Sequence, residues 1–91
     1  MLPIVWRASA RADLAEIIRY IADQDPQAAR RLLDQLESAV LPLAEHPYLY
    51  RSGRVPGTRE LVVHPNYVLV YRVAVDCVEV VSVLHSRQEY P

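Results

Sequence analysis

Lysine is absent from this chain of 91 residues, so all ten basic residues are arginine, and they face eleven Asp and Glu residues. The formal net charge of −1 argues against a protein that holds nucleic acid mainly through its phosphate backbone, because such proteins carry a clear positive excess. The charge is uneven along the chain. Residues 1–50 hold five Arg and seven acids, a net −2, whereas residues 51–91 hold five Arg and four acids, a net +1. We therefore expect any anion-binding surface in the second half.

Cysteine and long apolar runs are also scarce. The single Cys77 excludes an internal disulfide and suits a reducing compartment. No apolar run reaches the roughly 20 residues that a membrane span needs, and the first residues do not resemble a signal peptide. A hydrophobic fraction of 52% and a charged fraction of 23% are typical of a globular domain. We expect a single cytoplasmic domain over residues 1–91 with no membrane association.

The motifs of several familiar chemistries are missing. The two glycines form no phosphate-binding loop, and no Gly-x-Ser-x-Gly elbow occurs. One cysteine and three scattered histidines (His46, His64 and His85) do not have the spacing of a metal site. The paired carboxylates of a glycosidase are not evident. The sequence predicts neither a metal nor a cofactor.

Two helices are predicted in the first half, after a short strand over residues 2–6. Ser9 is expected to cap the first helix, and Asp25 with Pro26 begins the second. Pro42 predicts that the second helix stops or kinks there, and the short link between the helices favours an antiparallel hairpin. The first apolar stripe consists of Leu14, Ile17, Ile18, Ile21 and Ala22. The second consists of Ala29, Leu32, Leu33, Leu36, Val40 and Leu43.

A loop and three strands are predicted in the second half. The loop covers residues 48–58, and Pro56-Gly57 within it has the chemistry of a type II turn. Strands over residues 59–64, 67–75 and 78–84, joined by tight turns, favour an antiparallel meander. The order is β-α-α-β-β-β. We predict an α+β fold in which the helix hairpin packs on one face of a small antiparallel sheet and the opposite face stays partly open.

The residues with useful chemistry are arginines, tyrosines and histidines of the second half. Arginine binds phosphate through two parallel hydrogen bonds, tyrosine stacks on bases, and histidine moves protons near neutral pH. The candidates for binding a target or a phosphate are Arg54, Arg59 and Arg72. The candidates for catalysis, if the protein is a nuclease, are His85, Arg87 and Tyr90.

Each candidate also has a purely structural interpretation. His85 ends a predicted strand, where a solvent-facing or hydrogen-bonded side chain is common. Arg72 could pair with Glu60 or Glu79 across the sheet. Arg51 and Arg54 could be solvated loop residues.

The whole pattern resembles the RelE/ParE superfamily of bacterial toxins, the toxic halves of type II toxin–antitoxin modules. The resemblance extends over nearly the entire chain and agrees with the β-α-α-β-β-β order. The residues that carry it in the first half are Trp6, Ala12-Asp13-Leu14, Ile18, Tyr20-Ile21, Pro26, Ala28-Ala29, Leu43 and Pro47. Those in the second half are Gly53-Arg54, Gly57-Thr58-Arg59-Glu60-Leu61, Tyr67-Val68-Leu69-Val70-Tyr71-Arg72-Val73, Val83-Leu84-His85 and Arg87.

The resemblance implies one of two targets. RelE-like and YoeB-like members cut mRNA in the ribosomal A site with the message's own 2′-OH as nucleophile, whereas ParE-like members inhibit DNA gyrase. The nucleases often read Arg-Leu-Val-Tyr where this chain reads Val68-Leu69-Val70-Tyr71. Val68 cannot neutralise charge on a phosphate, and losing one such contact costs roughly 3–4 kcal/mol of transition-state stabilisation. Arg72 shares the predicted sheet face of Val68 but lies ~13 Å along the strand, too far to replace that contact.

Val68, the weak charge and the long helix hairpin favour a gyrase inhibitor that acts by binding and is not an enzyme. The alternative is a ribosome-dependent mRNA endonuclease, with His85 as acid or base, Arg87 on phosphate and Tyr90 on a base. A third hypothesis is a relative that only complexes its antitoxin and regulates their operon.

All three hypotheses share a partner, because the resemblance implies a cognate antitoxin that forms a hetero-oligomer with the toxin. Antitoxins of this family wrap a tail over the toxin. We expect that tail in the groove between the helix hairpin and the sheet. Its acidic residues would meet Arg51, Arg54 or Arg59.

Overall fold

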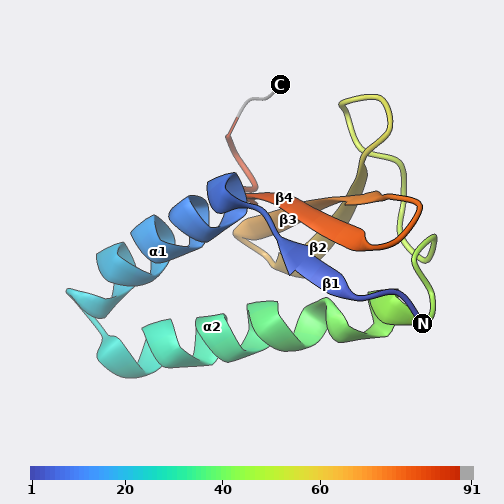
Figure 1. The fold of residues 1–91 in the computed structure, drawn as a ribbon. Coiled ribbons are helices and arrows are strands. Elements are labelled where there is room, and N and C mark those ends of the chain that lie inside the picture. Colours follow the sequence, from blue (N-terminus) through green and yellow to red (C-terminus); the bar gives the residue numbers. More distant parts are fainter. Residues whose placement is uncertain (89–91) are drawn as a thin grey trace.

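The computed structural model describes residues 1–88, and its elements follow the predicted β-α-α-β-β-β order (Figure 1). Tyr90, one of the candidates for catalysis, lies outside the described residues. The elements of the first half are β1 (Ile4–Trp6), α1 (Ala8–Ala22), α2 (Pro26–Ala39) and the short 3₁₀ helix η1 (Leu41–Ala44). Those of the second half are β2 (Arg59–His64), β3 (Tyr67–Val73) and β4 (Val78–His85).

The second helix begins and ends as its sequence predicts. The Asp25 carboxylate accepts a hydrogen bond of 3.1 Å from the Ala28 N–H, and Pro26 occupies the first helical turn, where its missing N–H costs nothing. The α-helix stops at Ala39, and the chain continues as η1, which contains Pro42. A proline in the α-helix itself would lack one backbone hydrogen bond, so the change of helix type accommodates it.

The predicted cap of the first helix is wrong. Helix α1 begins at Ala8, its N-cap position is Arg7, and no side chain caps it. The Ser9 hydroxyl instead donates a hydrogen bond of 2.7 Å to the carbonyl of Val81 in β4. The register between β3 and β4 shifts at this point, so that Val81 has no partner in β3. Ser9 therefore joins α1 to the sheet at the register shift in β4, which the sequence did not predict.

The sheet is mixed rather than purely antiparallel. Its strand order is β1-β4-β3-β2, and the three later strands form the predicted antiparallel meander. Strand β1, however, pairs parallel to β4, with Val5 opposite Glu79. A parallel pair needs a long crossover connection, and the chain from α1 through β3 supplies it.

The core lies between the helix hairpin and one face of the sheet (Figure 1). Tyr71, Leu69, Leu36 and Leu43 are fully buried there. Most residues of the two predicted helical stripes also belong to the core or pack against it, but Ala22 and Leu33 do not. Burying a side chain of this size contributes about 1.5–3 kcal/mol. The hairpin therefore holds one face of the sheet and leaves the other to the loop before β2.

Alternation along β3 assigns its residues to the two faces. Leu69 and Tyr71 belong to the helix-facing core, so Val68, Val70 and Arg72 lie on the opposite, open face. The open face is not bare, because Val70 is only 3% exposed. In Figure 1 the loop before β2 rises from the sheet on the side away from α2.

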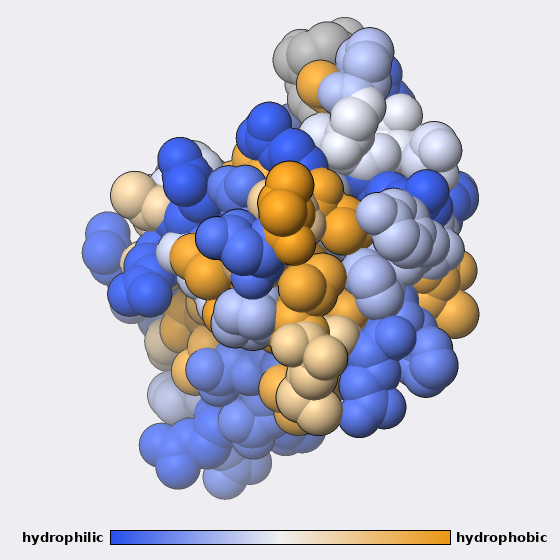
Figure 2. Space-filling model, turned by 45° about the vertical axis from the view of Figure 1, so that its right-hand side comes forward, coloured by the Kyte–Doolittle hydropathy of each residue, from blue (hydrophilic) through white to orange (hydrophobic). Residues whose placement is uncertain are grey.

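The surface alternates between apolar and polar side chains. Figure 2 shows hydrophobic residues gathered in the middle of one side of the molecule, with hydrophilic residues around them. Exposed large apolar residues include Leu41, Leu49, Val62 and Val75. Among residues 1–88, neither helix has the length and apolar character required to span a bilayer.

Candidate functional site

A hollow of about 230 Å³ lies at one end of the open face. We call it the arginine hollow. Strands β2, β3 and β4 form its floor, the loop before β2 forms one wall, and the residues that follow β4 form the other. Its lining consists of Arg51, Arg54, Glu60, Val62, Pro65, Val68, Leu84, His85, Ser86 and Gln88. It is the place where the sequence-predicted Arg51, Arg54 and His85 come together.

Glu60 is a charged residue inside this hollow, and its exposed fraction is only 5%. Its Oε1 accepts a hydrogen bond of 3.2 Å from Arg51 Nη2, and its Oε2 accepts one of 3.1 Å from the Arg54 backbone N–H. A buried carboxylate is tolerated only when it is paired and hydrogen-bonded. Glu60 therefore ties both arginine-bearing positions of the loop to the sheet.

Arg59 holds the same loop from the other face of β2. Its Nη1 donates to the Tyr50 carbonyl at 2.6 Å and to the Tyr48 carbonyl at 3.5 Å. Its guanidinium also lies over the Tyr48 ring, 4.9 Å from the centroid. Arg59 is absent from the lining of the arginine hollow and belongs to a separate depression beneath the loop. Its contacts in the described residues are those of a structural residue.

The loop is further fixed by Tyr71 and two glycines. The Tyr71 hydroxyl donates to the Pro47 carbonyl at 3.0 Å, and burial raises the pKa of this phenol. Gly57 has φ +85°, as the second central residue of the predicted type II turn requires. A Cβ on Gly53 would collide with the Thr58 hydroxyl. The loop is therefore held in one shape, which gives the arginine hollow a preformed wall.

His85 stands at the end of β4, at the rim of the arginine hollow. It is opposite Tyr67 in the sheet register, and the two rings meet edge to face with centroids 5.5 Å apart. Its Nδ1 accepts a hydrogen bond of 3.1 Å from the Arg87 N–H, which assigns the other ring nitrogen to carry the proton when the imidazole is neutral. The predicted pair His85 and Arg87 is thus linked through the backbone.

A second hollow, of about 350 Å³, lies on the other side of His85, between α1 and the sheet. We call it the acidic hollow. It shares Leu84, His85 and Gln88 with the arginine hollow. Its other lining residues are Asp13, Glu16, Ile17, Tyr20, Tyr67 and Val83. The Asp13 Oδ2 accepts a hydrogen bond of 3.0 Å from the Val83 N–H, which fixes α1 against β4.

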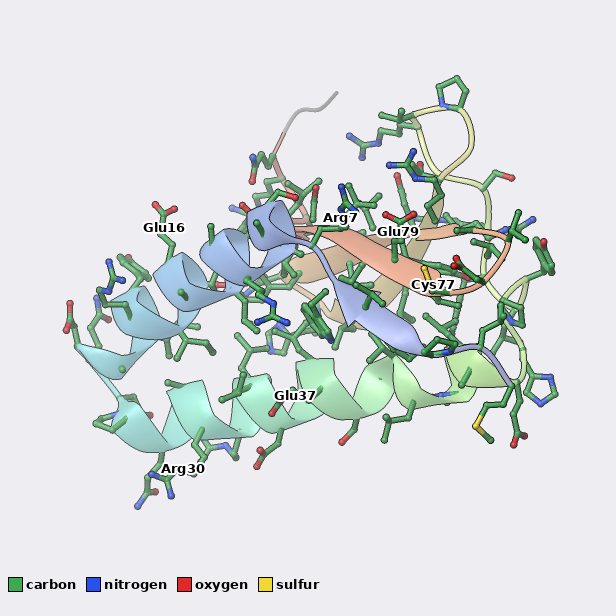
Figure 3. All side chains as sticks on the ribbon, in the orientation of Figure 1. Arg7, Glu16, Arg30, Glu37, Cys77 and Glu79 are labelled. Carbon is green, nitrogen blue, oxygen red and sulfur yellow. The ribbon has the colours of Figure 1, made fainter. Side chains whose placement is uncertain are left out.

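Arg72 is exposed and lies outside both hollows. It lies opposite Glu79 in the register, which made Glu79 a possible ion-pair partner. The Glu79 carboxylate is instead paired with Arg7 at 3.3 Å, and Figure 3 labels Arg7 and Glu79. The other proposed partner, Glu60, is paired with Arg51. Arg72 shares the open face with Val68, as predicted, at the opposite end of β3.

Val68 lines the arginine hollow, where it presents an apolar side chain. No group of three or more His, Cys, Asp or Glu residues suited to a metal ion occurs among residues 1–88. Sequence reasoning missed Glu60 as the organiser of the site. The available signal was the single acid of its strand, shortly after two loop arginines.

Comparison with known proteins places this chain in a toxin family. The family model described as "ParE toxin of type II toxin-antitoxin system, parDE" matches residues 4–90. The chain is 42% identical to Y4kP of Sinorhizobium fredii, a protein named as a candidate toxin, over 97% of this chain and 92% of that one. It is 41% identical to toxin RelE2 of Caulobacter vibrioides, over 97% and 99%.

Solved structures share the fold. A chain from the chromosomal ParDE system of P. aeruginosa superimposes with a TM-score of 0.83 at 22% identity, covering 93% of this chain and 96% of that one. A chain of the YoeB dimer from Staphylococcus aureus gives a TM-score of 0.63 at 14% identity, covering 98% of each. The predicted arrangement of a helix hairpin on one face of a small sheet is thus found in both.

Proposed function

Since the chain belongs to the ParE toxin family of type II toxin–antitoxin systems, we propose that it inhibits growth by binding DNA gyrase. A toxin of such a system is one half of a pair, and its activity is held in check by the antitoxin encoded with it. The proposal concerns the target of the toxin. On this proposal the protein is a binding inhibitor and has no catalytic residues.

Val68 is the observation that carries this proposal. It lines the arginine hollow at the position where the resemblance implies an arginine in the nucleases. A cleaved phosphate gains negative charge in the transition state, and an isopropyl group offers no donor to stabilise it. Arg72 stands at the far end of the strand, so it does not supply the missing donor.

The second candidate is a ribosome-dependent mRNA endonuclease. It is favoured by His85, which lies at the rim of a hollow that also contains Arg51 and Arg54. An imidazole beside guanidinium groups has the chemistry of a metal-free ribonuclease. Here His85 would move the proton, and Arg54 or Arg87 would hold the phosphate.

A supercoiling assay with the purified toxin tests the first candidate. We expect inhibition of gyrase at micromolar toxin and relief on addition of the antitoxin. Unaffected gyrase at that concentration contradicts the proposal. Toeprinting of translated messages tests the second, since cuts that disappear in His85→Ala or Arg87→Ala would establish the nuclease.

The antitoxin is the expected partner at two surfaces. One is the groove between the helix hairpin and the sheet, of which the acidic hollow is a part. The other is the loop wall with Arg51 and Arg54, where acidic side chains of the partner would find positive charge.

A further inference from the structure

We propose that the end of β4 is a docking ridge for an extended antitoxin segment carrying a basic side chain on one side of His85 and an acidic one on the other. The ridge consists of Leu84, His85 and Gln88, the residues that both hollows share. The inference rests on the antitoxin partnership proposed above and does not depend on whether gyrase is the target.

The acidic hollow provides one half of the ridge's charge pattern. Asp13 and Glu16 project from α1 one turn apart, so both carboxylates belong to the same side of the helix. Figure 3 shows Glu16 pointing away from α2 and into solvent. Tyr20 and Tyr67 supply aromatic rings to the same hollow. Carboxylates beside aromatic faces suit a guanidinium or ammonium group.

The arginine hollow provides the opposite half. The Arg51 side chain is 65% exposed, although one of its nitrogens is bonded to Glu60. A guanidinium has five donors, so a partner carboxylate can bind Arg51 while Glu60 keeps its contact. Glu60 lines the hollow but is only 5% exposed, so it holds the arginine in place and offers a partner little contact. This half suits an acidic side chain.

The two halves are continuous because they meet at His85. In the register His85 is opposite Tyr67, on the helix-facing side, whereas Leu84 is opposite Val68, on the open side. A segment that crosses the end of β4 therefore passes from one face of the sheet to the other. It would meet negative charge on one side and positive charge on the other, with the His85 ring and the apolar Leu84 side chain between them.

A ligand of a single charge sign fits this ridge poorly. A nucleic acid strand that crossed the ridge from Arg51 would bring phosphates close to Asp13 and Glu16, and like charges in close contact are strongly unfavourable. A purely acidic peptide meets the same repulsion. The charge pattern thus selects a protein segment with both signs.

Charge reversal at Glu16 separates these possibilities by the sign of its effect. We would measure the affinity of the full-length toxin for its full-length cognate antitoxin at low and physiological salt. A segment with a basic residue over the acidic hollow predicts that Glu16→Arg weakens binding by about tenfold, and Glu16→Gln by about threefold. A purely acidic segment predicts tighter binding of Glu16→Arg. Tighter or unchanged binding overturns the proposal.

The arginine half is tested with Arg51→Gln, which removes the positive charge and shortens the side chain, so that the Nη2 contact with Glu60 is lost as well. We expect about threefold to tenfold weaker binding to the antitoxin, with a smaller salt dependence. Unchanged binding contradicts the proposal. The matched controls are Asp34→Arg and Arg30→Gln on the exposed side of α2, and Figure 3 shows Arg30 directed away from the sheet. Both controls should bind like the wild type.

A short single-stranded RNA serves as the competing probe. We expect it to leave the toxin–antitoxin affinity unchanged. Competition by the RNA with wild-type toxin would overturn the ridge as a protein site. Thermal unfolding of each variant checks that the fold is intact. If these binding experiments contradict the ridge, the gyrase proposal still stands, because gyrase inhibition is measured without antitoxin.

Discussion

Glu60 accepts hydrogen bonds from Arg51 Nη2 and from the Arg54 backbone, and this pair of contacts joins the loop before β2 to the open face of the sheet. The pairing is asymmetric, because the Glu60 side chain is 5% exposed and that of Arg51 is 65% exposed. Solvent screens such an ion pair, so most of its value lies in satisfying the buried carboxylate.

Replacement of Glu60 should therefore loosen the loop. We expect Glu60→Ala to lower the free energy of unfolding by about 1–3 kcal/mol, because the Arg54 N–H loses its acceptor and a gap opens under the loop. Glu60→Gln keeps one acceptor oxygen and should cost less, about 1 kcal/mol. Urea denaturation measures both. A Glu60→Ala protein as stable as the wild type would mean that the contacts of Glu60 with Arg51 and Arg54 do not contribute to stability.

The two glycines of the loop predict opposite kinds of damage. Gly57→Ala forces a side chain into φ +85° and should cost about 1–2 kcal/mol through backbone strain alone, since no atom of residues 1–88 beyond its chain neighbours lies within 4 Å of the added Cβ. Gly53→Ala has no such strain, but its Cβ would displace the Thr58 hydroxyl from the Val55 carbonyl. Thermal unfolding of both variants, with exposed Ser52→Ala as control, checks this. Two wild-type melting curves would contradict the predicted shape of the loop.

Tyr71 predicts a pH dependence at the alkaline end. Burial raises the pKa of its phenol above the ordinary value of 10.0, so the unfolded chain loses this proton at a lower pH than the folded protein does. Unfolding therefore releases a proton once the pH passes about 10, and stability falls as the pH rises from there toward the folded pKa. Below that window this contribution is fully present.

Tyr71→Phe isolates the effect. The variant loses the hydrogen bond to Pro47, which should cost about 0.5–1.5 kcal/mol at neutral pH. It should also lose part of the alkaline decline, which denaturation at a series of pH values above 9 would reveal as a shallower slope. An identical slope in wild type and variant would assign the decline to other groups.

Much of this architecture could be predicted from local patterns. The apolar spacing of the helices, the Asp25-Pro26 start and the strands at residues 59–64 follow from short-range rules, and the structure confirms them. The parallel pairing of β1 was missed because it depends on a partner more than seventy residues away. The extra residue in β4 was missed because no glycine marks it, and the carbonyl of this residue, Val81, accepts the hydrogen bond from the Ser9 hydroxyl.

The sequence suggested which residues have binding chemistry, but not which of them the fold brings together. Residue type suggested that Arg51, Arg54 and His85 have binding chemistry, and the fold does place them around one hollow. Arg59 and Arg72 have the same chemistry, but strand alternation and distance along the sheet separate them from it. Glu60 escaped notice because its importance comes from burial, which appears only when the loop is folded over the sheet.

His85 gives the sharpest functional prediction. If the toxin acts by binding gyrase, proton transfer at His85 is irrelevant, so His85→Ala should inhibit supercoiling within about twofold of the wild type, which is less than about 0.5 kcal/mol. The same variant should arrest growth when it is expressed without antitoxin. If the wild type cuts translated messages and the variant loses both the cuts and the growth arrest, His85 would instead be identified as the acid or base of a nuclease. His64→Ala, which changes a histidine on the other side of Tyr67, is the matched control, since His64 also contacts the Tyr67 ring but is absent from both hollows.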